Sequence, residues 1–289
     1  MLARLFAYVQ LVLPKFWLTA VVYRMARIRH VAIKNFLITR FVRLFDIDTG
    51  DIKLVLPNDF ATFNDFFIRE LREGARPVDA SSAAIVSPAD GTISQAGHLR
   101  GGALLQAKGI EYSLDDLFAS NIDDARVFDN GCFATIYLAP YNYHRVHAPL
   151  AAELVSASYV PGELFSVNVA TAANIRGLFR RNERLILNFL TQHGPAALIF
   201  VGALNVGSIS TPWTGELRPR HAGGIETIDL GSEKILVHKG DLLGWFNMGS
   251  TVILLLPGEL CEWRAGLCAG ATVRMGEAIG TLRRLATEA

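Results

Sequence analysis

The chain has 289 residues, of which 51% are hydrophobic, and its net charge at pH 7 is +1. This length allows one large domain or two small ones. The hydrophobic fraction is high for a soluble enzyme, but it is too low for a protein with many membrane-spanning segments.

Residues 1–45 combine positive charge with apolar side chains. They contain eight Lys or Arg and no Asp or Glu, which leaves 20 basic against 27 acidic residues in the rest of the chain. A basic, apolar leader on an acidic body predicts an anionic surface as partner. Basic arms that bind nucleic acid are usually polar and flexible, whereas this segment is rich in Leu, Val, Phe and Trp. We therefore expect no nucleic acid partner.

The first part of the leader predicts a helix that lies in the membrane interface. A membrane span needs about 20 mostly apolar residues, and Arg4, Gln10, Pro14 and Lys15 interrupt the apolar run. On a helix, Arg4, Tyr8 and Lys15 align along one side. This pattern is typical of an amphipathic helix whose charges face anionic headgroups. The alternative is a helical hairpin packed on the protein's own core.

Pro14 is expected in the first turn of a second helix. In that helix Arg24, Arg27 and Lys34 fall on one side, and Trp17 contributes apolar surface. We expect these charges, too, to face lipid headgroups. A signal peptide is not expected, because no short basic segment and small-residue cleavage site flank the apolar run.

After the leader, the chain predicts two short helices and then mainly β structure. Thr62 and Asp65 have the spacing of a helix start, and that helix should run to about Arg72. Ser113 begins another short helix. From about residue 84, short apolar runs rich in β-branched residues alternate with glycine and proline. The predicted strands include residues 133–138, 154–160, 185–190, 197–206, 235–237 and 252–256.

One short pattern occurs twice near the C-terminus. Residues 237–244 and 273–280 share the form Val, two residues, Gly, an acidic residue, two residues, Gly, at a spacing of 36 residues. This form resembles the turn–strand units of biotinyl- and lipoyl-like folds, which sandwich two small sheets. The pattern therefore predicts a barrel-sandwich element.

The cysteines give no sign of a metal site. Cys132, Cys261 and Cys268 have neither metal-site spacing nor the pattern of a disulfide framework. Their odd number favours a reducing compartment.

Gly249-Ser250-Thr251, directly before the apolar strand, is the most informative motif. A serine after glycine can attack the carbonyl of that glycine, because glycine leaves the approach open and tolerates a strained backbone. The peptide bond then becomes an ester, elimination breaks the chain, and hydrolysis of the resulting dehydroalanine leaves a pyruvoyl group. The alternative is an ordinary Gly-Ser turn.

Further segments around this motif carry a family resemblance. They are residues 13–19, 62–69, 87–91, 141–149 and 159–168. In this order, and together with the Gly-Ser-Thr site, they closely resemble the bacterial membrane-associated phosphatidylserine decarboxylase proenzymes (prokaryotic type I), nearly end to end. The family's cleavage motif usually has Leu where this chain has Met248. This change is nearly isosteric, so we expect processing to survive.

The resemblance implies self-cleavage between Gly249 and Ser250 by the catalytic residues Asp90, His147 and Ser250. His147 would be the base that activates the serine, and Asp90 would hold the tautomer of its ring. His144 matches the family histidine that is linked to proton transfer during decarboxylation.

The resemblance also implies the cofactor and the substrate. A pyruvoyl group made from Ser250, without metal or pyridoxal phosphate, would form a Schiff base with phosphatidylserine and accept the electrons released with CO2. The product would be phosphatidylethanolamine. The residues expected to contact the substrate are Phe165, Ser166, Val167 and Asn168.

The expected architecture is of the α+β class. Amphipathic helices in residues 1–60 would bind the membrane, and a mainly antiparallel β catalytic domain with the barrel-sandwich element would span residues 61–289. Cleavage would give chains 1–249 and 250–289, which stay together as a heterodimer; a homodimer is left open. The expected location is peripheral, on the cytoplasmic face of the cell membrane.

Three alternatives remain at this stage. One is a pyruvoyl decarboxylase of another serine-headgroup lipid. Another is an uncleaved hydrolase that uses Ser250, His147 and Asp90. The third is a membrane-binding adaptor with a lipoyl-like domain and no catalysis. Taken singly, an Asp-Gly pair is a common turn and an isolated His is usually structural, so the joint occurrence of these motifs carries the argument.

Overall fold

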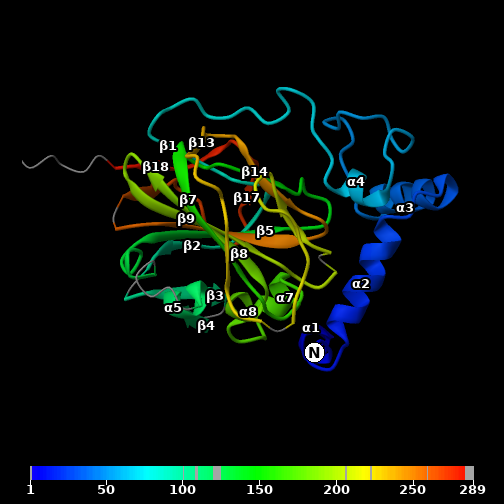
Figure 1. Cartoon of the computed structure of the whole chain (residues 1–289), viewed down its shortest axis with the longest axis horizontal. Helices are drawn as coiled ribbons and strands as arrows, with labels where there is room; N and C mark the ends of the chain where they lie inside the picture. The colour runs from blue at the N-terminus through cyan, green and yellow to red at the C-terminus, as the bar shows by residue number, and fades with distance from the viewer. Residues whose placement is uncertain are drawn as a thin grey trace, which may run out of the picture.

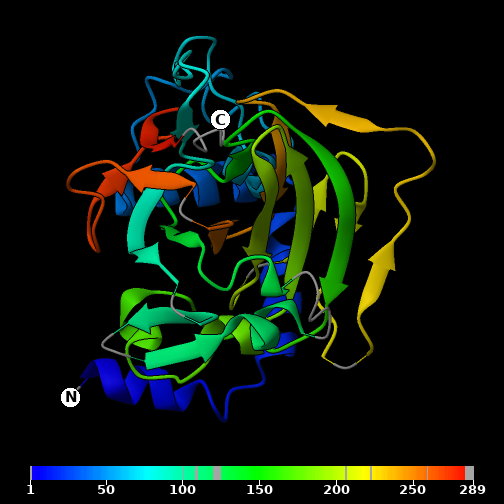
Figure 2. The ribbon, with the colours of Figure 1, turned by 90° about the vertical axis from the view of Figure 1, so that its left-hand side faces the viewer.

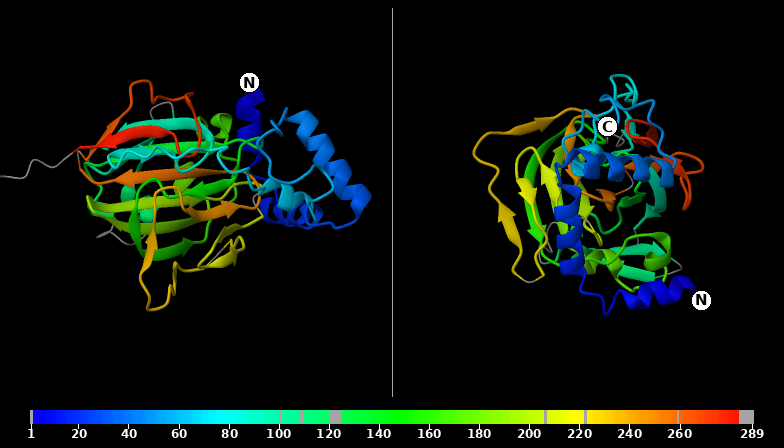
Figure 3. Two further views of the ribbon diagram at one scale, coloured as in Figure 1. Left: turned by 90° about the horizontal axis from the view of Figure 1, so that it is seen from above. Right: turned by 90° about the vertical axis from the view of Figure 1, so that its right-hand side faces the viewer.

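The computed structural model describes residues 2–99, 101–107, 110–119, 125–205, 207–221, 223–258 and 260–283. Three helices come first, α1 (Leu2–Val9), α2 (Lys15–Ala26) and α3 (Val31–Leu44), and the last two lie at one side of the β body (Figures 1 and 3). None of the described helices has the length and apolar character that a membrane crossing requires.

Several leader charges face the protein, which corrects the expectation that they face lipid headgroups. Lys15 is buried, and its Nζ lies 3.1 Å from the carboxylate of Glu163. Lys34 lies on α3 and not, as was expected, on the same helix as Arg24. It is buried, and its Nζ donates to backbone carbonyls of the loop before α4. Arg27 pairs with Glu216 at 2.7 Å. These cations lie against the body because carboxylate and carbonyl partners there offset the loss of water.

Helix α4 (Phe63–Phe67) begins as predicted and ends early. The Oγ of Thr62 accepts a hydrogen bond from the amide of Asp65 at 3.1 Å, so the predicted cap is confirmed. The helix stops at Phe67, short of Arg72, because the amide of Arg72 donates to the carbonyl of Asp51 in a pairing of two extended segments. The chain after Phe67 therefore leaves the helix.

An aromatic cluster joins α4 to the leader. Phe41 of α3 packs against Phe63, Phe66 and Phe67 with ring centroids 5.0 to 6.3 Å apart. Met248 packs against this same cluster, which is separate from the main core. Helix α4 is therefore fixed between the leader and the segment that carries the Gly-Ser-Thr motif.

The body consists mainly of antiparallel β structure, so the predicted α+β class is confirmed at that level. Its largest sheet has nine strands in the order β12-β7-β8-β9-β15-β5-β2-β17, with β13 paired to β7. They are β2 (Gly91–His98), β5 (Cys132–Leu138), β7 (Ala152–Val160), β8 (Arg184–Thr191), β9 (Gly194–Val201), β12 (Glu226–Ile228), β13 (Ile235–Val237), β15 (Ser250–Leu256) and β17 (Thr272–Val273). The sheet curves around the main core (Figure 2).

Three smaller sheets complete the body, in the orders β11-β10-β14-β6, β1-β18-β16 and β3-β4. Their strands are β1 (Ala84–Val86), β3 (Ala103–Ala107), β4 (Ile110–Ser113), β6 (Arg145–His147), β10 (Ile209–Thr211), β11 (Gly215–Leu217), β14 (Leu242–Phe246), β16 (Cys261–Trp263) and β18 (Ala278–Leu282). The remaining described helices are α5 (Leu114–Phe118), capped by Ser113 as predicted, α7 (Val169–Ala172) and α8 (Leu178–Arg181). The predicted strands agree with the observed ones within a few residues, except that β9 ends at Val201; Val206, where that strand was predicted to end, lies outside the described residues.

The two repeated patterns form equivalent turns. Gly240 joins β13 to β14 and Gly276 joins β17 to β18, with φ of +92° and +84°. A Cβ on Gly240 would lie 2.8 Å from the side chain of Val78, and a Cβ on Gly276 would lie 2.6 Å from the carbonyl oxygen of Pro77. Glycine is therefore required at both turns, which pack on one shared segment. The barrel-sandwich element built on these turns stays a prediction.

Candidate active site

Ser250 and Asp90 lie at one end of the nine-stranded sheet, and the two histidines lie on the segment that leads from it into the four-stranded sheet. Ser250 begins β15 and pairs with Leu138, the last residue of β5. Asp90 directly precedes β2, which pairs with the other side of β5. His144 and His147 lie on the segment that leaves β5 at the same end. The fold thus brings the segments that carry these residues to one end of β5 although they are far apart in sequence.

Ser250 and His144 are buried without hydrogen-bond partners. The Oγ of Ser250 and both ring nitrogens of His144 have none among the described residues. The His144 ring packs on Phe67 with centroids 4.0 Å apart. Burial, and then the charge of Arg69, lowers the pKa of His144 to about 3. His144 is therefore neutral near pH 7.

His147 is held by two hydrogen bonds that fix its tautomer. Its Nδ1 lies 2.8 Å from the carbonyl oxygen of Gly240, and its Nε2 lies 3.0 Å from the hydroxyl of Tyr143. A carbonyl only accepts, so Nδ1 carries the proton and Nε2 accepts from Tyr143. Burial lowers the pKa of His147 and raises the pKa of Tyr143 to about 12. At pH 7 the imidazole is a neutral base and the phenol is a donor.

Asp90 is bound by Arg76 and by the backbone of Met275. The guanidinium of Arg76 donates to the carboxylate over 2.6 to 3.0 Å, and the amide of Met275 donates to it at 2.8 Å. Among the described residues, no hydrogen bond joins Asp90 to His147 or His147 to Ser250. The residues are therefore close in the fold without the hydrogen bonds of an assembled triad.

The strand register separates the two histidines. The carbonyl of His144 accepts from the amide of Phe246, three residues before Gly249. His147 instead lies opposite Leu242, at the far end of β14. Of the two histidines, His144 therefore lies beside the end of β14 that leads into the Gly-Ser-Thr motif.

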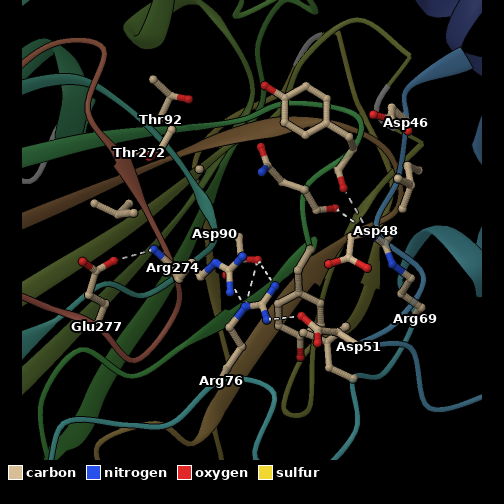
Figure 4. A pocket seen from close by; sticks show the side chains of 17 residues that line it. Asp46, Asp48, Asp51, Arg69, Arg76, Asp90, Thr92, Thr272, Arg274 and Glu277 are labelled. Carbon is tan, nitrogen blue, oxygen red and sulfur yellow. Dashed lines mark hydrogen bonds and ion pairs between the residues drawn. The ribbon is translucent and has the colours of Figure 1, made fainter.

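A polar cavity of about 490 Å³ opens beside Asp90 (Figure 4). Its wall includes Arg69, Arg76, Asp90 and Tyr143, and Figure 4 shows Arg76 directed at both Asp90 and Asp51. A second cavity of about 260 Å³ is apolar. It is lined by Val22, Met25, Ala26, Leu37, Arg40, Phe41, Leu44, Phe63 and Met248.

The four residues expected to contact substrate line neither of these cavities. The Phe165 ring lies 4.4 Å from the Nζ of Lys15, and the amide of Ser166 donates to Gln10 at 2.7 Å. Asn168 caps α7, and Val167 is buried. In this segment, Phe165 and Ser166 therefore contact residues of the leader and do not face either cavity.

Sequence reasoning missed four contacts of the site. Tyr143, Arg76, the Gly240 carbonyl and the Met275 amide hold His147 and Asp90. A signal for three of them existed, because Gly240 and Met275 lie in the repeated turns and Tyr143 lies in the segment 141–149. Arg76 carries no local signal. Among the described residues, no three His, Cys, Asp or Glu side chains are placed to hold a metal ion.

Comparison with known proteins identifies relatives along nearly the whole chain. A family model described as phosphatidylserine decarboxylase matches residues 63–281, and one described as PSD matches residues 5–46. Three similar curated proteins are named phosphatidylserine decarboxylase proenzyme. They come from Methylococcus capsulatus (44% identical, 97% of this chain and 97% of the relative), Azotobacter vinelandii (43%, 96% and 98%) and Saccharophagus degradans (40%, 96% and 98%).

Removing the hydroxyl of Tyr143 should raise the pKa of His147. The O–H of Tyr143 donates to Nε2 only when the ring is neutral, so this bond favours the neutral form and lowers the pKa. In Tyr143→Phe that preference is lost. With Ser250→Ala as a common background that keeps every chain uncleaved, NMR titration of the histidine ring protons should show a His147 pKa below 6.5 when Tyr143 is present and a higher pKa in Tyr143→Phe. Tyr141→Phe is the control, and equal His147 values in all three proteins would refute the assigned tautomer.

Proposed function

Because this chain belongs to the phosphatidylserine decarboxylase family and converts phosphatidylserine to phosphatidylethanolamine and CO2, we propose that it acts through a pyruvoyl group made from its own Ser250. One observation carries the proposal. Among the described residues, the Oγ of Ser250 is buried without a hydrogen-bond partner, and this serine directly follows Gly249, where even a Cβ would meet nothing within 4 Å. The unpaired nucleophile is therefore adjacent in the chain to the carbonyl that it would attack, and the Cα that bears this carbonyl is uncrowded.

The residues present fit the formation of this group. The Oγ of Ser250 forms a bond to the carbonyl carbon of Gly249, the C–N bond breaks, and the hydroxyl proton passes through a base to the amide nitrogen. Loss of the Cα proton then breaks the Cβ–Oγ bond, which releases residues 1–249 with a terminal carboxylate. Water replaces the nitrogen of the remaining dehydroalanine, ammonia leaves, and residues 250–289 begin with the pyruvoyl group.

We assign the base to His147. Its Nε2 has a lone pair and is neutral at pH 7, as general-base catalysis requires. To reach Ser250, the ring exchanges the hydroxyl of Tyr143 for that of the serine. Asp90 stabilises the protonated ring through its charge, which acts to raise the pKa of His147. The Gly240 carbonyl holds Nδ1 in the orientation that a triad would take from its carboxylate.

When formed, the pyruvoyl group supplies a carbonyl that condenses with the substrate amine and withdraws the electrons left by CO2. His144 then supplies the proton to the carbon that lost the carboxylate. Its ring is neutral in this structure because it is buried. The negative charge of a bound substrate carboxylate would raise the pKa of His144 and load the ring with a proton.

The two chains are proposed to stay together after cleavage. Strand β15 pairs with β5 and β9, and β17 and β18 pair with β2 and β1. All of these partners belong to the chain 1–249, so residues 250–289 remain held in three places of the fold. A homodimer and the contact of Phe165, Ser166, Val167 and Asn168 with substrate stay predictions.

We propose that residues 1–60 bind the surface of an anionic membrane. Large apolar side chains of the leader are exposed, among them Trp17 (64%) and Phe36 (59%). Arg24, Arg40 and Arg43 are exposed on the same helices. Apolar insertion combined with arginine–headgroup attraction is the pattern of a peripheral membrane helix. The apolar cavity between α2 and α3 leads from this surface to Met248.

Ser250→Ala should abolish both chain cleavage and decarboxylation, because no oxygen nucleophile remains. Ser250→Cys should still cleave, since a thiol undergoes the same acyl shift. Gel electrophoresis and CO2 release from phosphatidylserine measure the two outcomes. Normal cleavage of the alanine variant would overturn the proposal, and full activity of an uncleaved wild-type chain would favour a hydrolase-like use of Ser250.

His144→Ala and His144→Gln should separate the two reactions. His147 and Asp90 remain, so the chain should cleave at Gly249–Ser250. Turnover should fall by about 10²–10⁴-fold, the usual loss on removing a general acid. Mass spectrometry reports chain composition, and CO2 release reports turnover. Failure of both variants to mature would instead assign His144 to the cleavage step.

Trp17→Glu and Phe36→Glu should weaken binding to phosphatidylglycerol vesicles by about tenfold or more, because each loses the insertion of a large apolar side chain. Binding of the wild type should decrease with salt but not vanish. Sedimentation with vesicles measures both effects. Val155→Glu, at a 58% exposed position on β7, is the matched control. Equal loss in the control would refute a membrane site on the leader.

A further inference from the structure

The residue two positions before Ser250 has an unusual backbone. Met248 has φ of +120°, a conformation that L side chains rarely adopt. Such a conformation persists only where the surroundings over-determine it, and these positions cluster at functional sites. Met248 stands directly before Gly249, whose carbonyl is the target of the proposed attack. The surroundings that impose this turn therefore bear on the cleavage.

The turn is held on its N-terminal side by Asn247. This side chain is buried, and its Nδ2 donates to the Oγ of Ser208 at 2.8 Å and to the Oγ of Ser210 at 3.0 Å. Its Oδ1 accepts from the Nδ2 of Asn64 at 3.0 Å. Its backbone amide and carbonyl also pair, with Ser208 at 2.9 Å and with Gly207 at 3.1 Å. Five hydrogen bonds thus fix one residue.

The turn is held on its C-terminal side by the sheet. Ser250 pairs with Leu138, and Thr251 pairs with both β5 and β9. Only Met248 and Gly249 connect the fixed Asn247 to the fixed Ser250. Because both ends are held, the two connecting residues have little freedom, and Met248 takes the left-handed φ.

We propose that Asn247, held by Asn64, Ser208 and Ser210, is a positioning residue for self-cleavage that fixes the Met248 turn and presents the Gly249 carbonyl to the Oγ of Ser250. This inference rests on the proposed pyruvoyl chemistry. Asn247 does not touch the reacting atoms through its side chain. It acts by holding Met248 at its costly positive φ; without it, Met248 would relax to a negative φ that turns the carbonyl away from the serine.

Two further observations support this role. The side chain of Asn64 reaches Asn247 from α4, so a segment 183 residues away in sequence contributes to the turn. A Cβ on Gly249 would meet nothing within 4 Å, so no tight packing at its Cα restricts the backbone there. The orientation must come from the residues on either side. Of these, Ser250 is held by the sheet and Asn247 by the polar cluster.

The test follows cleavage of purified precursor over time for Asn247→Ala. The appearance of chain 250–289 should slow by about 10- to 100-fold, as expected when a reacting group is misplaced by about 1 Å. The pH dependence of the residual rate should keep the wild-type inflection below pH 6.5, because His147 is unchanged. Asn174→Ala, which removes an asparagine whose side chain donates to Ala170 within its own helical segment, is the matched control.

A second substitution distinguishes positioning from general damage. In Asn247→Ala/Met248→Gly, glycine adopts the left-handed φ at little cost, so cleavage should be faster than in Asn247→Ala alone. Ser210→Ala, which removes one of the two serine acceptors, should slow cleavage less and serves if Asn247→Ala does not fold.

The outcomes separate this inference from the proposed function. A wild-type chain that never cleaves would overturn the pyruvoyl proposal itself. A wild type that cleaves, with Asn247→Ala cleaving at the same rate, would overturn the positioning role alone. The positioning role would also be overturned if Asn247→Ala/Met248→Gly cleaved no faster than Asn247→Ala. A shift in the pH inflection of the Asn247→Ala cleavage rate would overturn it as well.

Discussion

The pairing of β15 on both of its sides is the constraint on which the site depends. Ser250 to Leu256 pair with β5, and Thr251 to Leu255 pair with β9, so all seven residues of the strand are buried. This places Ser250 out of water at a fixed position. Its apolar side chains each contribute about 1.5–3 kcal/mol by burial. That contribution does not depend on the peptide bond before Ser250, so the strand can lose this bond and keep its place.

Helix α4 and the residues directly after it connect the leader with the strand that carries Ser250. Asn64 reaches Asn247, Phe67 packs on the His144 ring, and Arg69 donates to the carbonyls of the segment before His144. The same helix packs through its phenylalanines on Phe41 of α3. The leader helices, which expose large apolar side chains, and the buried serine are therefore parts of one packed unit. If the leader binds the membrane as proposed, a lipid substrate that arrives there meets this packed unit.

Sequence alone predicted the elements whose signals are local. The caps at Thr62 and Ser113 follow from side-chain to backbone bonding within three residues, and the β-rich body follows from short apolar runs between glycines. The burial of Lys15 was not predictable, because its partner Glu163 is distant in sequence. The same holds for Arg76 at Asp90. The left-handed turn at Met248 has no sequence signal either, since a methionine there gives no hint of positive φ.

The site itself was predicted as a set of residues and not as an arrangement. Family-like motifs identified Asp90, His144, His147 and Ser250, and the fold gathers the segments that carry them. The hydrogen bonds of His147 with Gly240 and Tyr143 depend on how β6, β13 and β14 meet, which no local pattern specifies.

The mass of the purified wild-type protein tests the central claim most directly. The account predicts two chains, residues 1–249 and residues 250–289, with the second lighter by the mass of one ammonia than a chain that begins with serine. A single uncleaved chain of 31.6 kDa that decarboxylates phosphatidylserine would contradict it.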